Sequence, residues 1–561
     1  MRRLAAPARA PTAARRRGRY NRLSVSLLQS CVVRCSHGRG RPGGLPSVAW
    51  FTITTLGCKV NQYDGAAIAQ ALAAAGFRPL PAAAPTGPAD ALVVVNTCCV
   101  TAAAMAKSRQ AIRRALRDRC ASAVWISGCY ADYDPQGLQR LLATLGVPPG
   151  RAVVAGHHDD AGSRVAQLAS LLAAPDTHPE GPSFHRPDAG ACPFCRNDRS
   201  MSARMTPSRQ AGSTTSIIAT RRKAAVKANC VGVRNLQSLS SFPGRQRAFV
   251  KVQDGCDAFC AYCVVPYCRA AVWSRGVDEV HRECARLVAA GHKEIVLCGV
   301  FLGAFGRATA VRKKWGTEPS QLPDLIRRVG AVEGLWRLRL SSLEPGDLTD
   351  ELLEAYRDTP TAAWHFHLPL QSGSERILRR MNRQYAPADY RRAIERIRSA
   401  APLAAVTTDV IVGFPGESDA DFAATLEMAR YAGFSKIHAF RFSALRGTAA
   451  WTYRRQAPPP AMVKSRMAEL AALERELAQA YRRQFVGTRM EALVESSRRG
   501  RPHRAMTDRY LTVFFAAGSV IPGDVVELEI TGPHEQGLTG RLLGRPAPAC
   551  PKPAAGVESS P

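Results

Sequence analysis

Residues 248–263 read AFVKVQDGCDAFCAYC, an apolar strand-like run that leads directly into Cys256, Cys260 and Cys263. Soft thiolate ligands select iron–sulfur clusters or zinc over hard cations. Three thiolates on one short loop suit three irons of a 4Fe-4S cluster, whereas a structural zinc site takes four protein ligands. The fourth iron would then be open to a substrate or a cofactor. Cys268, five residues further on, offers a fourth thiolate, so a purely structural metal site is the alternative.

Strand-like runs recur through the following 180 residues, each separated from the next by a helical stretch. After residues 248–253 they occupy 294–299, 336–342, 365–370, 406–414 and 436–443. Six βα units rather than eight predict an incomplete parallel barrel, in which functional residues follow the strands at the C-terminal face. The residues at those positions are Cys256, Gly299, Glu344, Gln371 and Phe414. A long helix over 461–485 and short strands between turns then predict a small C-terminal β-barrel.

The same alternation of strands and helices precedes the barrel. Strand-like runs at 49–57, 91–97 and 123–129 alternate with helical stretches at 64–77 and 108–118. This order predicts a doubly wound α/β domain, whose ligands bind at the carboxyl ends of the strands. Cys58, Cys98 and Cys129 each stand at the end of such a run, so we expect them to converge. Taken alone, isolated cysteines are more often small buried hydrophobic residues.

Composition and charge restrict the class of protein. A length of 561 residues exceeds what one hydrophobic core serves and predicts three or four domains. The formal net charge of +32 indicates a polyanionic partner such as nucleic acid, with a membrane surface as the alternative. No apolar run is long enough for a transmembrane helix, so a soluble protein is expected. The 17 cysteines follow no disulfide framework, which favours metal or redox chemistry.

Three segments lack the periodicity of folded domains. Residues 1–47 hold eleven Arg and no Lys, Asp or Glu, which fits an organelle transit peptide, a disordered arm or translation upstream of a true start near Val48. Residues 175–245 are interpreted as a disordered linker or insert. This segment contains Cys192, Cys195 and Cys230. We interpret them as unliganded thiols rather than as a zinc site, because their spacing is irregular. Residues 547–561 are a tail.

These motifs together resemble those of a known family, the radical S-adenosylmethionine methylthiotransferases. The spacing Cys-x3-Cys-x2-Cys with an aromatic residue before the last cysteine is the motif of the radical superfamily. The resemblance extends to LGCKVNQYD (56–64), NTCCVT (96–101), SGCY (127–130), HLPLQSGSERILRRMNRQY (367–385) and DVIVGFPGESDADF (409–422). It implies a methylthiotransferase domain over 48–174, a radical barrel over 246–480, and a small RNA-binding β-barrel, similar to a TRAM domain, over 481–546.

The resemblance also implies two 4Fe-4S clusters and their ligands. The residues that match the ligands of the cluster that binds S-adenosylmethionine are Cys256, Cys260 and Cys263. Those that match the ligands of a second, auxiliary cluster are Cys58, Cys98 and Cys129. In the family, one-electron cleavage of S-adenosylmethionine gives the radical that removes hydrogen from C2 of an adenine, and a second S-adenosylmethionine supplies the methyl group. Cys99 stands beside Cys98, but the NTC motif aligns with Cys98.

Further positions at strand ends match contacts to S-adenosylmethionine in the superfamily. They are Gly299, Gly303, Glu344, Gln371 and Ser372. Tight turns and ordinary loop hydrogen bonds are the alternative roles for these residues.

Contacts to RNA are expected in the last barrel. A basic loop there offers phosphate contacts through Arg498, Arg499, Arg501 and Arg504. The aromatic residues of YLTVFF (510–515) are candidates for base stacking. The alternatives are a solvated loop and a strand whose aromatic residues belong to the core.

Within the family, LGCKVNQYD and the helix KSRQAIRRA (107–115) are most similar to the branch that methylthiolates N6-threonylcarbamoyladenosine at position 37 of tRNA. We therefore expect a monomeric cytoplasmic enzyme, without membrane contact, that binds the tRNA anticodon loop and takes electrons and sulfur from donors the sequence does not identify. The alternatives are methylthiolation of isopentenylated adenosine 37 or of a ribosomal-protein aspartate, a non-catalytic iron–sulfur RNA-binding protein, and a redox disulfide protein.

Overall fold

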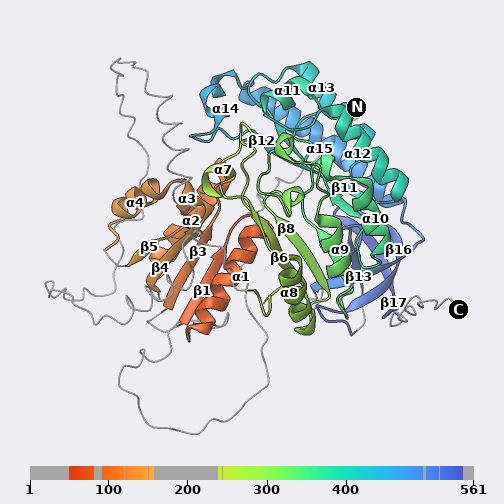
Figure 1. Ribbon diagram of the computed structural model, residues 1–561, viewed down its shortest axis with the longest axis horizontal. Helices are drawn as coiled ribbons and strands as arrows, with labels where there is room; N and C mark the ends of the chain where they lie inside the picture. The colour runs from red at the N-terminus through yellow and green to blue at the C-terminus, as the bar shows by residue number, and fades with distance from the viewer. Residues whose placement is uncertain are drawn as a thin grey trace, which may run out of the picture.

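The computed structural model consists of two α/β domains followed by a closed β-barrel. It describes residues 50–80, 91–118, 121–148, 151–156, 238–242, 244–496, 501–516 and 519–546. Figure 1 shows the N-terminal sheet in orange beside the green and cyan strands of the second layer, with the C-terminal barrel in blue. The predicted α/β class with a small C-terminal β-barrel is confirmed.

The N-terminal sheet is parallel throughout and has the order β2-β1-β3-β4-β5. Its strands are β1 (Trp50–Thr55), β2 (Arg78–Pro79), β3 (Ala91–Thr97), β4 (Ala121–Gly128) and β5 (Ala152–Val154), and its helices are α1 (Lys59–Ala74), α2 (Ala102–Arg117), α3 (Cys129–Tyr133) and α4 (Pro135–Thr144). Leu72 of α1 packs on one face with Phe51 and Leu92, while Ile112 of α2 packs on the other. Helices on both faces confirm the doubly wound arrangement.

Helix α1 begins five residues earlier than the apolar pattern predicts. Its first turns, KVNQYD, are largely polar, which hides the helical period, yet Val60, Tyr63 and Asp64 are buried. They are buried because this end of α1 packs against β6 of the following barrel. The sequence pattern missed the turns because they face a second domain rather than their own sheet.

Six parallel strands in sequence order form the incomplete barrel. They are β6 (Arg247–Asp254), β8 (Glu294–Gly299), β9 (Arg337–Leu340), β10 (His365–His367), β11 (Ala405–Val412) and β12 (Lys436–Arg441), with β7 (Trp273–Ser274) antiparallel at the edge beside β6. A parallel bridge between Ser342 and His367 joins the two halves of this sheet. The predicted partial barrel is therefore present, with each strand inside or within one residue of its predicted run.

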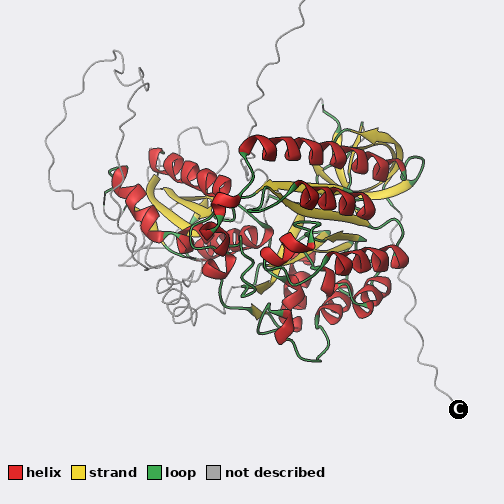
Figure 2. Cartoon of the chain, turned by 90° about the horizontal axis from the view of Figure 1, so that it is seen from above, coloured by secondary structure: helices red, strands yellow, loops and turns green. Residues whose placement is uncertain are grey.

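Helices surround the barrel strands on the outside, as Figure 2 shows in red around yellow. They are α7 (Val265–Cys268), α8 (Val277–Ala289), α9 (Leu322–Gly330), α10 (Asp350–Asp358), α11 (Glu375–Arg380), α12 (Pro387–Ala400), α13 (Asp419–Ala432), α14 (Ala449–Thr452) and α15 (Pro460–Arg483), with short 3₁₀ turns η1 (Leu302–Ala304), η2 (Arg312–Lys314), η3 (Pro345–Asp347) and η4 (Arg454–Gln456). Among the described residues, no helix is long and apolar enough to cross a membrane.

The C-terminal barrel closes in the order β13-β14-β15-β17-β16. Its strands are β13 (Arg489–Ser496), β14 (His503–Thr507), β15 (Thr512–Phe515), β16 (Val525–His534) and β17 (Gly537–Gly544). It is fixed to the incomplete barrel by two buried arginines of β9: Arg337 Nη1 donates to the Met506 carbonyl at 2.9 Å, and Arg339 Nη1 donates to the Asp508 carbonyl at 2.9 Å. Glu294 Oε1 accepts from Arg339 Nε at 3.0 Å, which balances the buried charge.

The segment expected as a linker, 175–245, ends in ordered structure. Leu239 and Phe242 are buried in the core of the incomplete barrel, so the packed chain begins before residue 245. Several predictions concern positions outside the described residues. These positions are residues 1–47, Cys192, Cys195, Cys230, Arg498, Arg499 and the tail at 547–561.

A buried cluster fastens α1 to the barrel. Tyr63 Oη donates to Glu283 Oε1 at 3.0 Å, and Arg275 Nη1 lies 2.5 Å from Glu283 Oε2. The Leu239 main-chain N–H also donates to Glu283, at 3.0 Å. The Glu283 side chain is fully buried, whereas the other carboxylate that pairs with Arg275, Glu279, is 43% exposed.

Removal of Glu283 should therefore destabilise the chain far more than removal of Glu279. We expect Glu283→Ala to cost about 3–5 kcal/mol, because it leaves the Arg275 charge buried without its main partner. The matched variant Glu279→Ala should cost less than about 1 kcal/mol, as exposed ion pairs do. The measurement is the urea midpoint of the full-length chain, and equal midpoints for the two variants would contradict the prediction.

Candidate functional site

The structure brings Cys58, Cys98 and Cys129 to one edge of the N-terminal sheet. Each follows a strand, β1, β3 or β4, and these three strands are neighbours in the parallel order. Gly57 has a φ of +99°, and a Cβ built there would lie 2.8 Å from Cys98 Sγ. Residue 57 must therefore be glycine for the Cys98 thiol to approach the start of α1.

Burial keeps the Cys98 and Cys129 thiols protonated when no metal is bound. It raises the pKa of Cys98 to about 11, with the neighbouring Cys58 and Cys268 adding to the shift. Burial also raises the pKa of Cys129, which Arg269 opposes by donating Nε to Cys129 Sγ at 3.3 Å. Binding of a metal to such thiols releases their protons, and a positive guanidinium beside the sulfur favours the thiolate.

Cys256, Cys260 and Cys263 lie together on the loop that follows β6. The Cys256 main-chain N–H donates to the Arg269 carbonyl at 3.0 Å, which closes the loop on itself. Gly255 has a φ of +79°, and a Cβ there would lie 1.8 Å from the Ala271 carbonyl oxygen, so no other residue fits. Burial raises the pKa of Cys263 to about 12, and the nearby Cys260 adds to the shift.

A buried arginine holds the loop cysteines on the barrel side. Arg383 Nη1 donates to Cys260 Sγ at 3.3 Å and to Tyr262 Oη at 3.4 Å. Its Nη2 lies 2.5 Å from Glu344 Oε1. Its Nε is buried and has no acceptor within the part of the chain that the structure describes. A cation with a spare donor beside three sulfurs fits an anionic ligand at this place.

A buried ionic network lies between the two cysteine groups. Lys251 Nζ is 2.6 Å from Asp64 Oδ1 and 2.8 Å from Asp254 Oδ2. Arg269 is 2.5 Å from Asp64 Oδ2 and 2.8 Å from Asp254 Oδ2. Two cations thus face two carboxylates, which compensates the cost of burial. Because Arg269 also contacts Cys129, and its carbonyl accepts from Cys256, one residue positions both cysteine groups.

The donor set fits iron–sulfur clusters better than single metal ions. In the described ranges, no three His, Cys, Asp or Glu side chains are arranged to hold one metal ion. A cubane cluster needs no such arrangement, since each thiolate binds a different iron and the sulfurs stay apart. Two groups of three cysteines, each with one arginine donating to a sulfur, match that requirement.

The five positions expected at S-adenosylmethionine differ in their surroundings. Glu344 is buried, pairs with Arg383 and Arg312, and contributes to the raised pKa of Cys256, for which burial is the main cause. Gln371 has a φ of +61° and bridges to β11. The Ser372 hydroxyl is fully buried 3.4 Å from Thr425 Oγ1, so it faces α13 rather than the cysteine loop.

The two glycines make room for side chains that shape the loops. A Cβ at Gly299 would lie 2.9 Å from Gln253 Oε1, and one at Gly303 would lie 2.1 Å from Asp347 Oδ1. Gln253 Nε2 donates to the Asp254 and Gly255 carbonyls at 2.8 Å and so supports the turn before Cys256. These glycines therefore serve close packing.

Arg269, Arg383 and the residues of the ionic network were not predicted from the sequence. Arg269 follows the cysteine loop in VVPYCRA, and Arg383 lies inside the motif that ends at residue 385. A basic residue just beyond a cysteine-rich loop was the available signal for Arg269. Arg383 is 120 residues from Cys263 in the sequence, so only the closing of the barrel reveals its contact with Cys260.

The outer face of the C-terminal barrel carries an aromatic and basic cluster. The Phe514 ring is half-buried, its centroid lies 4.3 Å from that of His534, and the Arg504 guanidinium is 5.8 Å from it. Arg501 and Arg504 are exposed, but only Arg501 lies in a loop as predicted, because Arg504 belongs to strand β14 and pairs there with Phe514. Tyr510, in contrast, stacks on His365 at 4.7 Å, and Phe515 is buried in the core.

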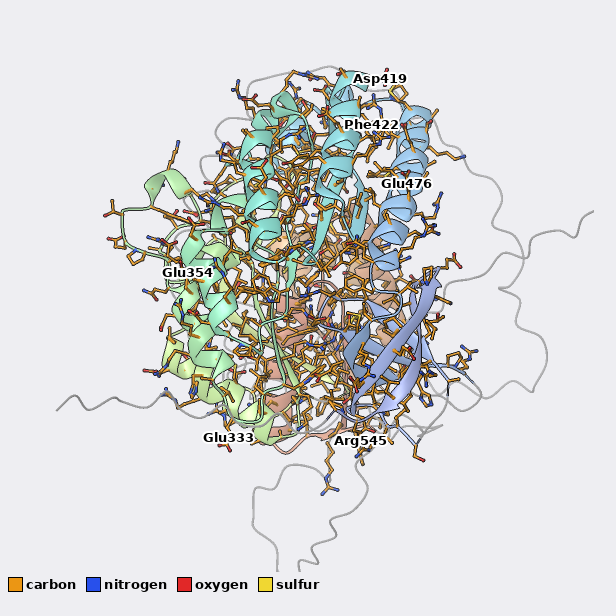
Figure 3. The ribbon with its side chains drawn as sticks, turned by 90° about the vertical axis from the view of Figure 1, so that its right-hand side faces the viewer. Glu333, Glu354, Asp419, Phe422, Glu476 and Arg545 are labelled. Carbon is orange, nitrogen blue, oxygen red and sulfur yellow. The ribbon has the colours of Figure 1, made fainter. Side chains whose placement is uncertain are left out.

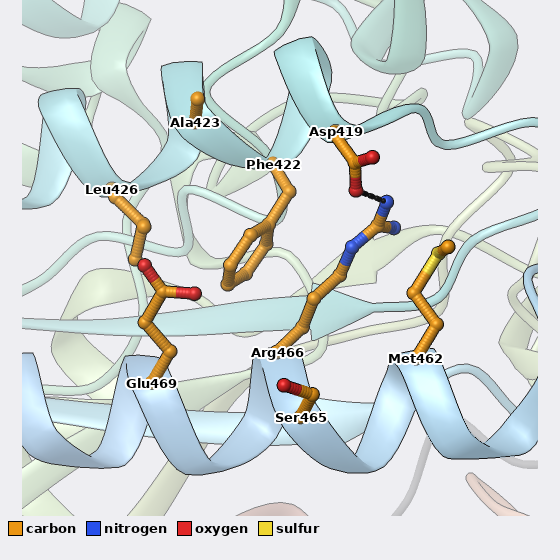
Figure 4. Close-up of a pocket in the computed structure, with 8 residues that line it drawn as sticks. All are labelled: Asp419, Phe422, Ala423, Leu426, Met462, Ser465, Arg466 and Glu469. Atoms are coloured by element: carbon orange, nitrogen blue, oxygen red, sulfur yellow. Dashed lines mark hydrogen bonds and ion pairs between the residues drawn. The ribbon is translucent and has the colours of Figure 1, made fainter.

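An open pocket of about 270 Å³ lies on the outer helices, between α13 and α15. Figure 4 shows Arg466 of α15 paired with Asp419 of α13, with Phe422 beside them. Figure 3 places Asp419 and Phe422 near one end of the molecule and Arg545 near the other. None of the cysteines or other candidate residues lines this pocket, so the chemistry is placed elsewhere.

Comparisons with known proteins agree with the geometry. Residues 250–429 match the Radical SAM superfamily, and residues 50–146 match "Uncharacterized protein family UPF0004". The chain is 30% identical over 494 residues to the threonylcarbamoyladenosine tRNA methylthiotransferase MtaB of Chlamydia pneumoniae, covering 88% of this chain and 98% of the relative.

A relative that acts on a different nucleoside is equally similar. The chain is 31% identical over 502 residues to the tRNA-2-methylthio-N(6)-dimethylallyladenosine synthase of Paracoccus denitrificans, covering 89% of this chain and 98% of the relative. Among solved structures, it is similar to the radical S-adenosylmethionine methyltransferase TsrM of Kitasatospora setae, at 14% identity and a TM-score of 0.43 over 72% of this chain and 73% of that one. The extent and identity of the match to the curated relatives show that the chain belongs to the radical S-adenosylmethionine methylthiotransferase family, whose members use S-adenosylmethionine and two 4Fe-4S clusters.

Proposed function

We propose that the chain adds a methylthio group to C2 of N6-threonylcarbamoyladenosine at position 37 of tRNA. The observation that carries the proposal is the placement of two groups of three cysteines on either side of one buried ionic network. Such a pair of sites suits a reaction that needs one cluster to start a radical and another to handle sulfur. A single structural cluster would need only one of them.

In this proposal Cys256, Cys260 and Cys263 hold the radical cluster, and Cys58, Cys98 and Cys129 hold the auxiliary cluster. When bound, the clusters and S-adenosylmethionine supply the one-electron chemistry and the sulfur and methyl groups. Arg383 and Arg269 each donate a hydrogen bond to one ligand sulfur, at 3.3 Å. Hydrogen bonds to the sulfurs and burial are what set the potential of such a cluster.

The remaining residues orient the cofactor and exclude water. Glu344 is held by Arg383 and Arg312 close to the cysteine loop, where its carboxylate can accept hydrogen bonds from the amino group of S-adenosylmethionine. Gln371, in a left-handed backbone conformation four residues beyond β10, exchanges main-chain hydrogen bonds with Asp409 and Ile411 of β11, which fixes its place at the same end of the barrel. Gly299 and Gly303 act indirectly, through the packing of Gln253 and Asp347.

Lys59 favours the threonylcarbamoyl substrate over the isopentenylated one. It follows Cys58 directly, is half-buried, and has no ion-pair partner among the described residues. Burial is the main cause that lowers the pKa of the buried His365 on β10, and Lys59 is among the cations that add to the shift, so Lys59 lies near the interior of the barrel. The threonyl group carries a carboxylate, whereas the isopentenyl group is uncharged, and a partly buried ammonium discriminates between them electrostatically.

The tRNA itself is proposed to contact the C-terminal barrel. Arg501 and Arg504 are exposed cations for the phosphates, and Phe514 with His534 offers a surface on which an unpaired base can stack. The related proteins named as tRNA-modifying enzymes support this partner. The net charge of +32 provides long-range attraction to the polyanion.

The iron content of anaerobically reconstituted protein tests the ligand assignment. We expect about eight irons per chain, and about four after Cys98→Ala or Cys256→Ala, because each substitution removes a ligand of one cluster. Cys284→Ala, at a fully buried cysteine of α8, is the matched control and should keep about eight. Four irons or fewer in the unsubstituted protein would contradict the assignment.

Nucleoside mass spectrometry identifies the substrate. The chain is expressed in a bacterium that lacks its own tRNA methylthiotransferases. It should produce the 2-methylthio derivative of threonylcarbamoyladenosine and no 2-methylthio derivative of isopentenylated adenosine. Accumulation of the isopentenylated product alone would favour the rival substrate. Lys59→Met should lower conversion by about tenfold or more, since one lost charge contact of about 1.4 kcal/mol corresponds to tenfold, while Lys59→Arg should retain most of it.

Substitution in the aromatic and basic cluster tests the RNA contact. Phe514→Ala should weaken binding of an anticodon stem-loop by about 5- to 150-fold, because loss of one base–aromatic stack costs about 1–3 kcal/mol. Arg541→Ala, on the same barrel and already paired with Glu529, is the control and should change the affinity less than twofold. Fluorescence anisotropy at fixed salt measures both, and equal affinities for the two variants would place the RNA elsewhere.

A further inference from the structure

Cys99 and Cys268 are two thiols that the proposed cluster ligands leave over. Cys99 follows β3 in the N-terminal sheet, and Cys268 ends α7 beside the radical barrel. They are 169 positions apart in the chain, yet their sulfurs lie 3.6 Å apart. Both are buried, with exposed fractions of 1% and 2%. Their proximity therefore belongs to the join between the two α/β layers.

The packing around the pair holds both sulfurs in place. The two side chains belong to one apolar cluster that includes Tyr130 from the N-terminal layer and Leu445 from the barrel. Cys99 Sγ also donates to the Cys129 carbonyl at 3.3 Å, which restrains the position of this sulfur. A pair so enclosed has little freedom to turn away, so each thiol is the nearest reaction partner of the other.

We propose that Cys99 and Cys268 form a redox-active pair that hydrogen peroxide converts into a disulfide joining the N-terminal sheet to the radical barrel. One thiol gives up its proton and its sulfur attacks a peroxide oxygen; the O–O bond breaks, and the hydroxide that leaves takes up that proton and becomes water. The second thiol then attacks the sulfenic sulfur, forms the S–S bond and releases the oxygen as a second water. The two sulfurs lose two electrons in total, and peroxide gains them.

The geometry requires only a small movement for this bond. A disulfide has a sulfur separation of about 2.05 Å, so the sulfurs must approach by about 1.5 Å, shared between two side chains. Hydrogen peroxide is smaller than two water molecules, and the neighbouring Cys58 is exposed at the same edge of the sheet. Cys99 stands next to Cys98, and Cys268 stands next to Arg269. The bond would thus tie together the two segments that carry the proposed ligands of both clusters.

Peptide mapping of the full-length, reconstituted protein tests the proposal. After exposure to peroxide and alkylation of the remaining thiols, trypsin should release residues 252–269 joined to the peptide that contains Cys99. Both peptides hold further cysteines, so fragmentation spectra must place the bond at Cys99 and Cys268. We expect the cross-link in most chains after oxidation, its loss on treatment with dithiothreitol, and its absence from Cys99→Ala and Cys268→Ala. The matched control Cys284→Ala should retain it.

Iron content separates this proposal from the proposed function. If Cys99→Ala or Cys268→Ala loses about four irons, that residue is a cluster ligand and the redox pair is overturned. Absence of the cross-link in the unsubstituted protein, or its persistence in both alanine variants, also overturns it. An unsubstituted protein that forms the disulfide but binds four irons or fewer would leave the pair standing and contradict the two-cluster function instead.

Discussion

The structure depends above all on the buried network of Asp64, Lys251, Asp254 and Arg269. Two carboxylates and two cations, all less than 10% exposed, cross the join between α1 and β6. Charges of this kind are costly to bury and tolerate little displacement, since the loss of one partner leaves another charge uncompensated. The network therefore sets the position of the N-terminal sheet on the barrel with a strictness that apolar packing alone does not give.

Two arginines extend this control to the sulfur atoms. Arg269 belongs to the network and donates to Cys129, while Arg383 donates to Cys260 and pairs with Glu344. In both places a permanent positive charge is buried beside sulfur, which lowers the cost of holding an anionic cluster in a region where burial alone keeps thiols protonated. A buried arginine beside a cysteine sulfur is thus found in both α/β domains, although their folds differ.

The parts of the fold that could be predicted from the sequence are those whose apolar side chains are buried within the same domain. The runs at 91–97 and 294–299 coincide with β3 and β8 because both strands are covered on both faces and read as continuous apolar segments. The first turns of α1 were missed because they pack through polar side chains. Strands β14 and β17 cannot be read from the sequence pattern, because their short or glycine-rich segments lack a clear alternation.

For the site, the cysteines could be predicted from the sequence because thiols at fixed spacing are rare. The contacts of Arg383 and the contact between Cys99 and Cys268 could not be predicted, because they arise only when distant segments meet.

The attachment of the C-terminal barrel also depends on contacts between distant segments. Arg337 donates to the carbonyl of Met506 in β14, and Arg339 donates to the carbonyl of Asp508 in the turn that follows, so this barrel is fixed to the incomplete barrel rather than flexibly linked to it. An RNA bound to the C-terminal barrel would therefore lie at a fixed distance from the cysteine loop. The fold itself thus sets the distance between the surface that binds RNA and the site of the reaction.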